Sequence, residues 1–154
     1  MPPTAQMERG RLHPTPAQLE GLTDLMARHE RGLIVCGPYC PGGTFPDAVA
    51  ALARRVGYPL IADPLSGVRF GPHTQNAPLV ATYDSRPPAG EGPELVLRFG
   101  AVPTSQRLND YLLNSRPAHL IHVNASGVWA DDSHRVSWFL QADEVAVCEG
   151  VGEI

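Results

Sequence analysis

The sequence contains no lysine, because all 12 basic residues are arginines. A Schiff-base lysine and the lysine of a phosphate-binding P-loop are therefore excluded. Cysteine is also scarce. The three thiols, Cys36, Cys40 and Cys148, form neither an even set nor a C-x-x-C pair, so we expect them to be reduced. No run approaches the roughly 18 apolar residues of a membrane span, and no secretory signal opens the chain. These absences predict a cytoplasmic protein without a membrane span.

Basic charge is in short supply as well. The 16 acidic residues outnumber the 12 arginines and give a net charge of -4. A nucleic-acid-binding surface is normally basic, so we expect no nucleic-acid partner. A length of 154 residues suits one domain, and a hydrophobic content of 43% is enough for a core.

The centre of the chain predicts a βαβ unit. A short apolar run at residues 33–36 stops at a Gly/Pro-rich turn, and apolar residues then recur with helical spacing over residues 45–56. Thr44 stands where an N-cap belongs, and Gly57 supplies a left-handed stop. A second strand is predicted at residues 59–62. Such a unit requires a parallel sheet with helices on its faces.

The flanking segments repeat this pattern. A capping box at residues 15–18 opens a helix that reaches about residue 29. Residues 63–73 predict a long ordered loop, and residues 79–84 predict a helical turn or a short helix. The expected later elements are a strand at 95–99, a helix at 104–115, a strand at 119–123 and a last strand at 136–140.

The predicted fold class is therefore α/β: a Rossmann-like three-layer sandwich with a mostly parallel sheet of about five to six strands. Residues 1–14 hold three prolines and no periodicity, which predicts a tail or linker. We expect the domain itself to span residues 15–145. Residues 143–154 are expected to be the start of a helix or a linker, and we assign residues 146–154 to the start of a linker to a downstream domain.

Two motifs near the first strand allow a functional reading and a structural one. The glycines of Gly37-x-x-x-x-Gly42-Gly43 resemble a phosphate-cradling turn before a helix, yet the turn lacks a P-loop lysine and G-x-G-x-x-G spacing. A structural turn is therefore favoured. Cys36 and Cys40 lack a second pair with zinc spacing, so a buried Cys36 and an incidental Cys40 are favoured over a metal site.

The histidines and acids give no complete catalytic set. None of the six histidines forms an H-x-x-x-H or H-E-x-x-H pair, and His119 and His122 are expected to be hydrogen-bonded histidines of the core or edge. Asp131, Asp132 and His134 form an acid/histidine cluster without a partner nucleophile. For this cluster the sequence favours a loop or capping role.

Four segments carry a family resemblance. They are Leu33-Ile-Val-Cys-Gly37, Val56-Gly-Tyr-Pro-Leu-Ile-Ala-Asp-Pro-Leu-Ser-Gly-Val-Arg69, Val96-Leu-Arg-Phe-Gly-Ala-Val-Pro-Thr-Ser-Gln-Arg-Leu108 and Gly127-Val-Trp-Ala-Asp-Asp-Ser-His134. Together they resemble the middle domain of the 2-succinyl-5-enolpyruvyl-6-hydroxy-3-cyclohexene-1-carboxylate synthases, the MenD family. The resemblance covers residues 15–145, and its most specific part is residues 57–67. The chain has Gln106 where the family commonly has lysine, and Asp132 where it commonly has proline.

The resemblance implies a transferase of menaquinone biosynthesis as the intact parent. The family decarboxylates 2-oxoglutarate on thiamine diphosphate, with magnesium, and adds the succinyl unit to isochorismate. Its cofactor lies between a pyrimidine-binding and a diphosphate-binding domain, which we expect to be the partners of this chain in a homo-oligomer. The chain itself is then expected to be a non-catalytic structural or regulatory domain, of the DHS-like middle-domain type, that binds no cofactor or metal.

Four residues are candidates for contact with ligands. Arg69 follows the loop after the second predicted strand, and Arg98 lies near the end of the strand at residues 95–99. Open α/β sheets bind ligands at the carboxyl ends of their strands, so both arginines are candidates for a regulatory anion site. The sequence favours the alternative, in which they satisfy loop carbonyls or acids such as Asp63. Gln106 and Arg107 begin a helix at the same rim, and the resemblance implies a substrate contact at Gln106, where the family commonly has lysine. Arg107 supplies the missing charge if the helix entry turns it inward, and the alternative is that it lies on the solvated face.

Two other functions remain open from the sequence. One is a free-standing nucleotide- or anion-binding module that uses the turn at residues 37–44. The other is an FAD-binding or nucleotide-binding middle domain of a different thiamine-diphosphate enzyme.

Overall fold

The computed structural model describes residues 4–86 and 90–152. Within these residues the chain forms one five-stranded sheet whose paired strands all run parallel, in the order β2-β1-β3-β4-β5. The strands are β1 (Gly32–Cys36), β2 (Leu60–Ala62), β3 (Leu95–Phe99), β4 (His119–Val123) and β5 (Trp138–Leu140). The predicted α/β class with a parallel sheet is confirmed.

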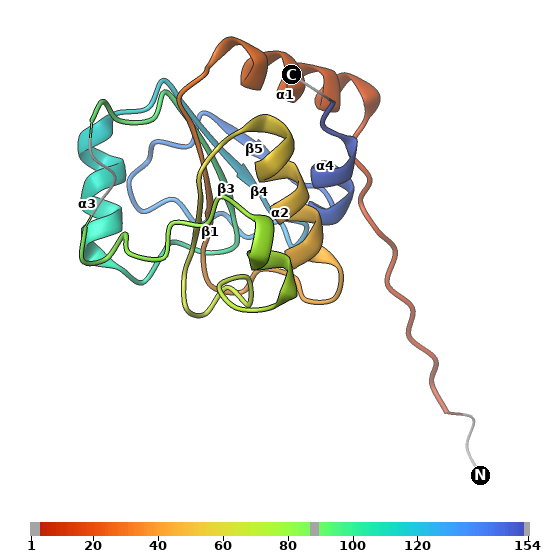
Figure 1. Ribbon diagram of the computed structural model, residues 1–154. Coiled ribbons are helices and arrows are strands. Elements are labelled where there is room, and N and C mark those ends of the chain that lie inside the picture. Colours follow the sequence, from red (N-terminus) through yellow and green to blue (C-terminus); the bar gives the residue numbers. More distant parts are fainter. Residues whose placement is uncertain (1–3, 87–89, 153–154) are drawn as a thin grey trace.

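Helices cover both faces of the sheet (Figure 1), as the three-layer prediction requires. The helices are α1 (Pro16–Arg28), α2 (Phe45–Val56), α3 (Gln106–Ser115), α4 (Glu144–Gly150) and a short 3₁₀ helix, η1 (Pro72–Asn76). Buried residues of α1, α2 and α4 share one apolar cluster with Ile34 and Leu97. Leu108 and Leu112 of α3 share the other with Leu33. No helix in the described part of the chain is long and apolar enough to cross a membrane.

The predicted cap at the start of α1 and the predicted stop at the end of α2 are confirmed, whereas the predicted cap at the start of α2 is not. Thr15 and Gln18 form the reciprocal capping box of α1, and Gly57 ends α2 with φ 71°. Thr44 precedes α2 as predicted, but its side chain makes no capping hydrogen bond. Its backbone is already helical (φ -87°, ψ -4°), whereas a capping side chain needs an extended residue.

Two later elements begin further along the chain than predicted. Helix α3 begins at Gln106 rather than residue 104, because the side chain of Ser105 accepts the Leu108 amide and caps it there. Strand β5 begins at Trp138 rather than residue 136. The carboxylate of Asp131 accepts the amides of Arg135 and Val136, which therefore do not join the sheet.

The segment after β2 also differs from its prediction. The end of the loop expected at residues 63–73, together with the three residues after it, forms η1 over residues 72–76. In the segment expected to be helical, Leu79 instead makes an isolated parallel bridge with Leu60, so it is extended. A single turn follows, in which the Arg86 amide bonds the Thr82 carbonyl at 2.8 Å.

The predicted domain boundary at residue 145 falls inside α4. Val147, Cys148 and Val151 are buried at 0%, 1% and 2% exposure, so the described residues beyond 145 pack into the core. Of the helix or linker expected from residue 143, the structure shows the helix, α4, and the start of a linker to a downstream domain remains a prediction. Residues 4–13 lie outside the core and are exposed.

Candidate functional site

The carboxyl-terminal edge of the sheet brings together the loops that follow β1, β2, β3 and β4. The chain leaves β1 toward β2 on one side and returns to β3 on the other. Ligand-binding crevices of open α/β sheets form at such a reversal of strand order. All four residues predicted from the sequence lie in this part of the molecule or on the strand beneath it.

Asp63 organises this edge, although from the sequence it was only a possible partner of the arginines. It follows β2 and is fully buried. One carboxylate oxygen accepts the Leu65 amide at 2.8 Å, and the other accepts the amide and hydroxyl of Thr104, both at 2.7 Å. Asp63 therefore joins the loop after β2 to the segment that leads into α3. In the sequence, Asp63 lies within residues 57–67, the most specific part of the family resemblance, and that position pointed to a role for it.

Arg98 lies on β3 and is 5% exposed. Its guanidinium donates a hydrogen bond to the Ala130 carbonyl. Within residues 4–86 and 90–152, its Nε has no hydrogen-bond partner. Burial lowers the pKa of Arg98, while the nearby charges of Asp131 and Asp132 act in the opposite direction. Arg98 is thus a buried cation whose Nε–H has no partner in the described residues.

His122 lies opposite Arg98 on β4 and is fully buried. Its Nε2 contacts the Gly100 carbonyl at 2.9 Å, and its Nδ1 finds no partner in the part of the chain that the structure describes. Burial, followed by the charge of Arg98, lowers the pKa of His122 to about 4. His122 is therefore a neutral, hydrogen-bonded core histidine at pH 7, which agrees with the structural reading of the sequence.

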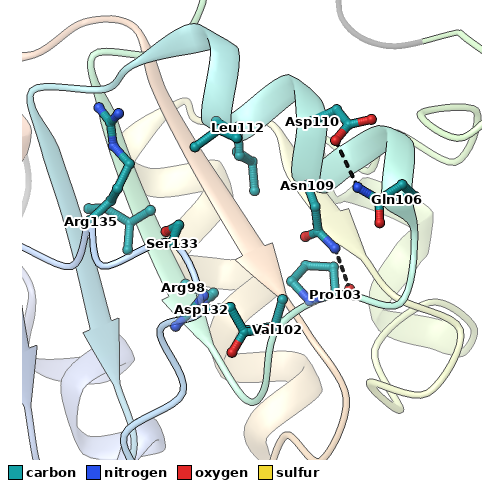
Figure 2. A pocket seen from close by; sticks show the side chains of 12 residues that line it. Arg98, Val102, Pro103, Gln106, Asn109, Asp110, Leu112, Asp132, Ser133 and Arg135 are labelled. Carbon is teal, nitrogen blue, oxygen red and sulfur yellow. Dashed lines mark hydrogen bonds between the residues drawn. The ribbon is translucent and has the colours of Figure 1, made fainter.

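A cavity of about 320 Å³ opens beside Arg98. Figure 2 shows α3 on one side of it, with Gln106 and Asn109, and residues 132–135 on the other. Apolar side chains make up much of the wall: Val102, Pro103, Leu112, Leu113 and Leu120. Gln106 donates to Asp110 at 2.8 Å, and Asn109 donates to the Pro103 carbonyl at 2.8 Å. The cavity therefore combines an apolar wall with a buried cation.

Arg69 and Arg107 line a separate hollow on the other side of the first turn of α3. Arg69 donates to the Tyr83 hydroxyl and to the Ala81 carbonyl. Arg107 donates to the Asp84 carbonyl at 3.0 Å. Arg98 is not part of this hollow, so the structure does not bring Arg69 and Arg98 together in one pocket as predicted. Gln106 lines both pockets.

The glycine-rich turn after β1 has a packing role. The Gly37 amide bonds the Phe99 carbonyl at 2.9 Å, and the Ala101 amide bonds the Pro38 carbonyl at 2.7 Å. A Cβ on Gly37 would lie 1.8 Å from the Ala101 oxygen, so glycine is needed for this close approach. The structural reading of the turn is thereby supported. Tyr39 and Pro41 of the same turn line a wide groove that extends to residues 124–126 and 9–12.

The acid/histidine cluster after β4 also has a structural role. The Asp131 carboxylate accepts the amides of Arg135 and Val136. It also accepts the Ser133 hydroxyl at 3.0 Å. These hydrogen bonds, together with the charge of Arg98, lower the pKa of Asp131 although its burial acts in the opposite direction. Within the described residues, no group of three His, Cys, Asp or Glu side chains could hold a metal ion.

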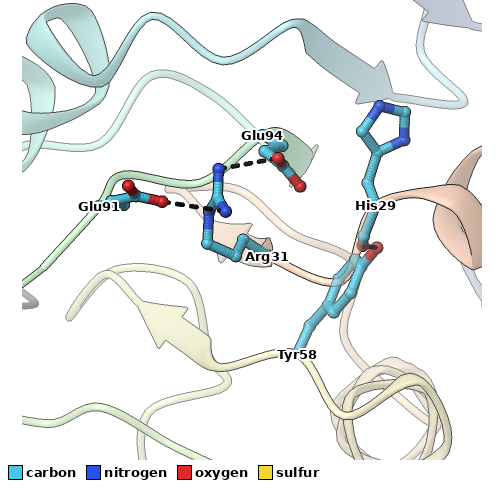
Figure 3. A network of polar contacts seen from close by, with 5 residues as sticks. All are labelled: His29, Arg31, Tyr58, Glu91 and Glu94. Atoms are coloured by element: carbon cyan, nitrogen blue, oxygen red, sulfur yellow. Dashed lines mark hydrogen bonds and ion pairs between the residues drawn. The ribbon is translucent and has the colours of Figure 1, made fainter.

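The opposite, amino-terminal edge of the sheet carries the polar network of Figure 3. Arg31 pairs with Glu91 at 3.0 Å and with Glu94 at 2.7 Å. The Tyr58 hydroxyl donates toward the carbonyls of Met26 and His29 at the end of α1. Burial, with a smaller contribution from Glu94, raises the pKa of Tyr58 to about 12, so its hydroxyl stays a donor. This network fixes the entry of the chain into β1 and β3.

Comparison with known proteins identifies relatives for most of the chain. A family model described as the middle domain of thiamine pyrophosphate enzymes matches residues 13–151. The 2-succinyl-5-enolpyruvyl-6-hydroxy-3-cyclohexene-1-carboxylate synthase of Roseiflexus castenholzii is 51% identical over 136 residues, which cover 86% of this chain and 23% of that protein. The synthase of the same name from Halorubrum lacusprofundi is 39% identical over 166 residues, with coverages of 92% and 27%. The chain thus spans about a quarter of the length of these relatives.

Solved structures share the fold. An enzyme from Mycobacterium smegmatis, described as thiamin diphosphate-dependent, aligns with a TM-score of 0.56 and 18% identity over 98% of this chain and 30% of that one. The 4-hydroxybenzoylformate decarboxylase of Rhodococcus jostii RHA1 aligns with a TM-score of 0.51 and 18% identity, over 97% of this chain and 30% of its own. At such identities the likeness is one of fold.

Gly32 at the amino-terminal edge generates a prediction about stability. A Cβ at Gly32 would lie 1.9 Å from the Tyr58 ring, whereas a Cβ at Gly42 meets nothing within 4 Å. We expect Gly32→Ala to lower the free energy of unfolding by about 1–3 kcal/mol, as overpacking does. Gly42→Ala should change it by less than about 1 kcal/mol. Urea denaturation measures both, and equal stability of the two variants would contradict the contact between Tyr58 and Gly32.

His122 generates a prediction about pH. Its pKa is about 4 in the folded protein and near 6.5 when unfolded, so between these values only the unfolded state gains the proton. Stability should therefore fall as pH decreases from 6.5 to 4, by at most about 1.4 kcal/mol per pH unit from this group. His122→Leu should flatten that part of the profile, even if it lowers stability at pH 7. His13→Gln, at an exposed residue outside the core, serves as the control.

Proposed function

The chain belongs to the family of middle domains of thiamine pyrophosphate enzymes, and we propose that it serves as the non-catalytic middle domain of a 2-succinyl-5-enolpyruvyl-6-hydroxy-3-cyclohexene-1-carboxylate synthase. The observation that carries this proposal is the identity of 50% and 51% to two Roseiflexus synthases over 84% and 86% of the chain. The intact enzyme would condense 2-oxoglutarate with isochorismate on thiamine diphosphate, with loss of CO₂ and with magnesium as the metal.

The described residues of this chain do not fit thiamine diphosphate and its metal. Within residues 4–86 and 90–152, no group of three acidic, His or Cys side chains could hold a metal ion. The glycine-rich turn after β1, where an anion could otherwise lie, is packed against the loop after β3. We therefore assign no step of thiamine chemistry to this chain. That the isolated chain binds no cofactor remains a prediction.

The proposed contribution of the chain to substrate binding comes from the start of α3. Arg107 is exposed, follows the cap residue Ser105 and lies with Arg69 in the hollow at the carboxyl edge. Both proposed substrates are polyanions, for which an arginine fork is a suitable ligand. Gln106 keeps a hydrogen-bond donor at the position where the family commonly has lysine. We propose that Gln106 and Arg107 face the substrates in the intact enzyme.

Arg69 and Arg98 remain proposed anion-binding residues with a regulatory role, in two pockets instead of one. The unused donor of Arg98 and the apolar wall of its cavity would suit a small carboxylate with an apolar body. Arg69 would act from the hollow that it shares with Arg107. The proposed partners are the pyrimidine-binding and diphosphate-binding domains of a cytoplasmic homo-oligomer.

An exchange of domains tests the proposed function. In the Roseiflexus castenholzii synthase, the segment matched by this chain is replaced by residues 13–151 of this chain. We expect the hybrid to consume 2-oxoglutarate in the presence of isochorismate. The isolated chain should not consume 2-oxoglutarate, and calorimetry with magnesium should detect no binding of thiamine diphosphate to it. A folded but inactive hybrid, or magnesium-dependent binding by the isolated chain, contradicts the proposal. Stabilisation of the isolated chain by FAD or ADP in a thermal-shift assay would favour a nucleotide-binding domain instead.

The role proposed for Arg107 can be measured in the same hybrid. Arg107→Ala should raise the KM for one of the two substrates by about 10-fold or more, because a charge-assisted hydrogen bond of about 1.5–3 kcal/mol is lost. Turnover should change little, since such binding is equal in the ground and transition states. Arg28→Ala, at the exposed end of α1, is the control. If the KM values of the Arg107→Ala and Arg28→Ala variants are the same for both substrates, Arg107 has no part in substrate binding.

A further inference from the structure

Two cysteines meet at the turn between β1 and α2. Cys36 is the last residue of β1 and is fully buried, while Cys40 is partly exposed at the end of the turn. Cys40 packs against the buried apolar cluster to which Cys36 belongs. The Cys40 thiol also donates to the Gly37 carbonyl at 3.2 Å. The turn therefore places two thiols side by side, one in the core and one within reach of solvent.

The backbone around these thiols is held from three directions. The Asp63 amide bonds the Cys36 carbonyl at 2.8 Å, and the Pro38 carbonyl accepts the Ala101 amide at 2.7 Å. Gly100 packs so closely that an added Cβ would lie 2.9 Å from the Cys40 sulfur. The Cys40 sulfur is thus held near the end of β1 by a fixed scaffold, which raises the effective concentration of one thiol near the other.

We propose that Cys36 and Cys40 form an oxidative modification site, at which a peroxide converts the two thiols into an intramolecular disulfide. The partly exposed Cys40 reacts first. Cys36 is the resolving thiol because burial shields it from the oxidant. The raised pKa of Cys36, which results mainly from burial and then from its contact with Cys40, also keeps that thiol protonated and slow to react with peroxide.

The reaction balances with one peroxide for the two thiols. The Cys40 thiolate attacks one peroxide oxygen, the O–O bond breaks, and Cys40 becomes a sulfenic acid as water leaves. The Cys36 sulfur then attacks the Cys40 sulfur, the S–O bond breaks, and a second water carries away the hydroxyl. Two electrons pass from the pair of thiols to the peroxide, and a thiol reductant such as dithiothreitol reverses the change.

The disulfide would close a loop around the turn that carries Tyr39. Tyr39 is 87% exposed, has φ 62° and lines the wide groove at the carboxyl edge together with Pro41. A cross-link beneath this turn fixes one wall of that groove. Oxidation therefore acts on the edge of the sheet where the candidate ligand pockets lie.

Peptide mapping of the peroxide-treated chain tests the proposal. Arg31 and Arg54 flank both thiols, so trypsin releases them on residues 32–54, and chymotrypsin then cuts between them at Tyr39. The native chain is treated with hydrogen peroxide, denatured, alkylated and digested with both enzymes. We expect the Cys36 and Cys40 peptides to stay joined until dithiothreitol is added. Cys148, on the peptide that follows Arg135, should be alkylated.

Three variants complete the experiment. Cys148→Ser should form the same cross-link as the unaltered chain, and Cys40→Ser should form none. Cys36→Ala should stop at the sulfenic acid of Cys40, which dimedone labels. Separation of the two peptides without reductant, or a cross-link from Cys40 to Cys148, overturns the proposal. Should Cys36→Ala not fold, the unaltered chain and the other two variants still decide between these outcomes.

Discussion

The buried carboxylate of Asp63 is the contact on which the carboxyl-terminal edge of this domain depends. A charge taken out of water is tolerated only where hydrogen bonds replace its hydration. Here the Leu65 amide and both donors of Thr104 do so. Because β1 lies between β2 and β3, these bonds tie the loops of two strands across the end of a third. The position of α3, which begins two residues after Thr104, follows from them.

The placement of α3 then decides how the arginines are grouped. Within the described residues, α3 contributes the helical side chains of the smaller apolar cluster, while three helices share the larger one. Space remains on both flanks of its first turn. Arg98 borders the cavity on one flank, and Arg69 and Arg107 border the hollow on the other. A helix that begins at Gln106 thus separates Arg98 from Arg69 and Arg107.

Local patterns in the sequence were enough to predict most of the elements but not their partners. Helical spacing, the capping box at Thr15 and the left-handed Gly57 are properties of adjacent residues, and all three are found in the structure. The late start of β5 depends on Asp131 capturing two amides, and the burial of Cys148 depends on the packing of α4 against the core. Such contacts join residues by folding, so periodicity does not reveal them. The four candidate residues were placed at the correct edge, but their division between two pockets depends on the side of each strand and helix that they occupy.

Arg98 and His122 show how the sheet register sets the electrostatics of the site. The two residues are direct partners in adjacent parallel strands, so their side chains lie on the same face. Burial disfavours the charged form of both, and the charge of Arg98 disfavours protonation of His122 further. The arginine keeps its charge because its ordinary pKa is so high, and the histidine remains neutral. Within residues 4–86 and 90–152, each keeps one nitrogen without a partner, at a cost of about 1–3 kcal/mol for each unmet hydrogen bond. The fold therefore holds a buried, incompletely bonded cation at a cavity with an apolar wall, although the chain as a whole is acidic.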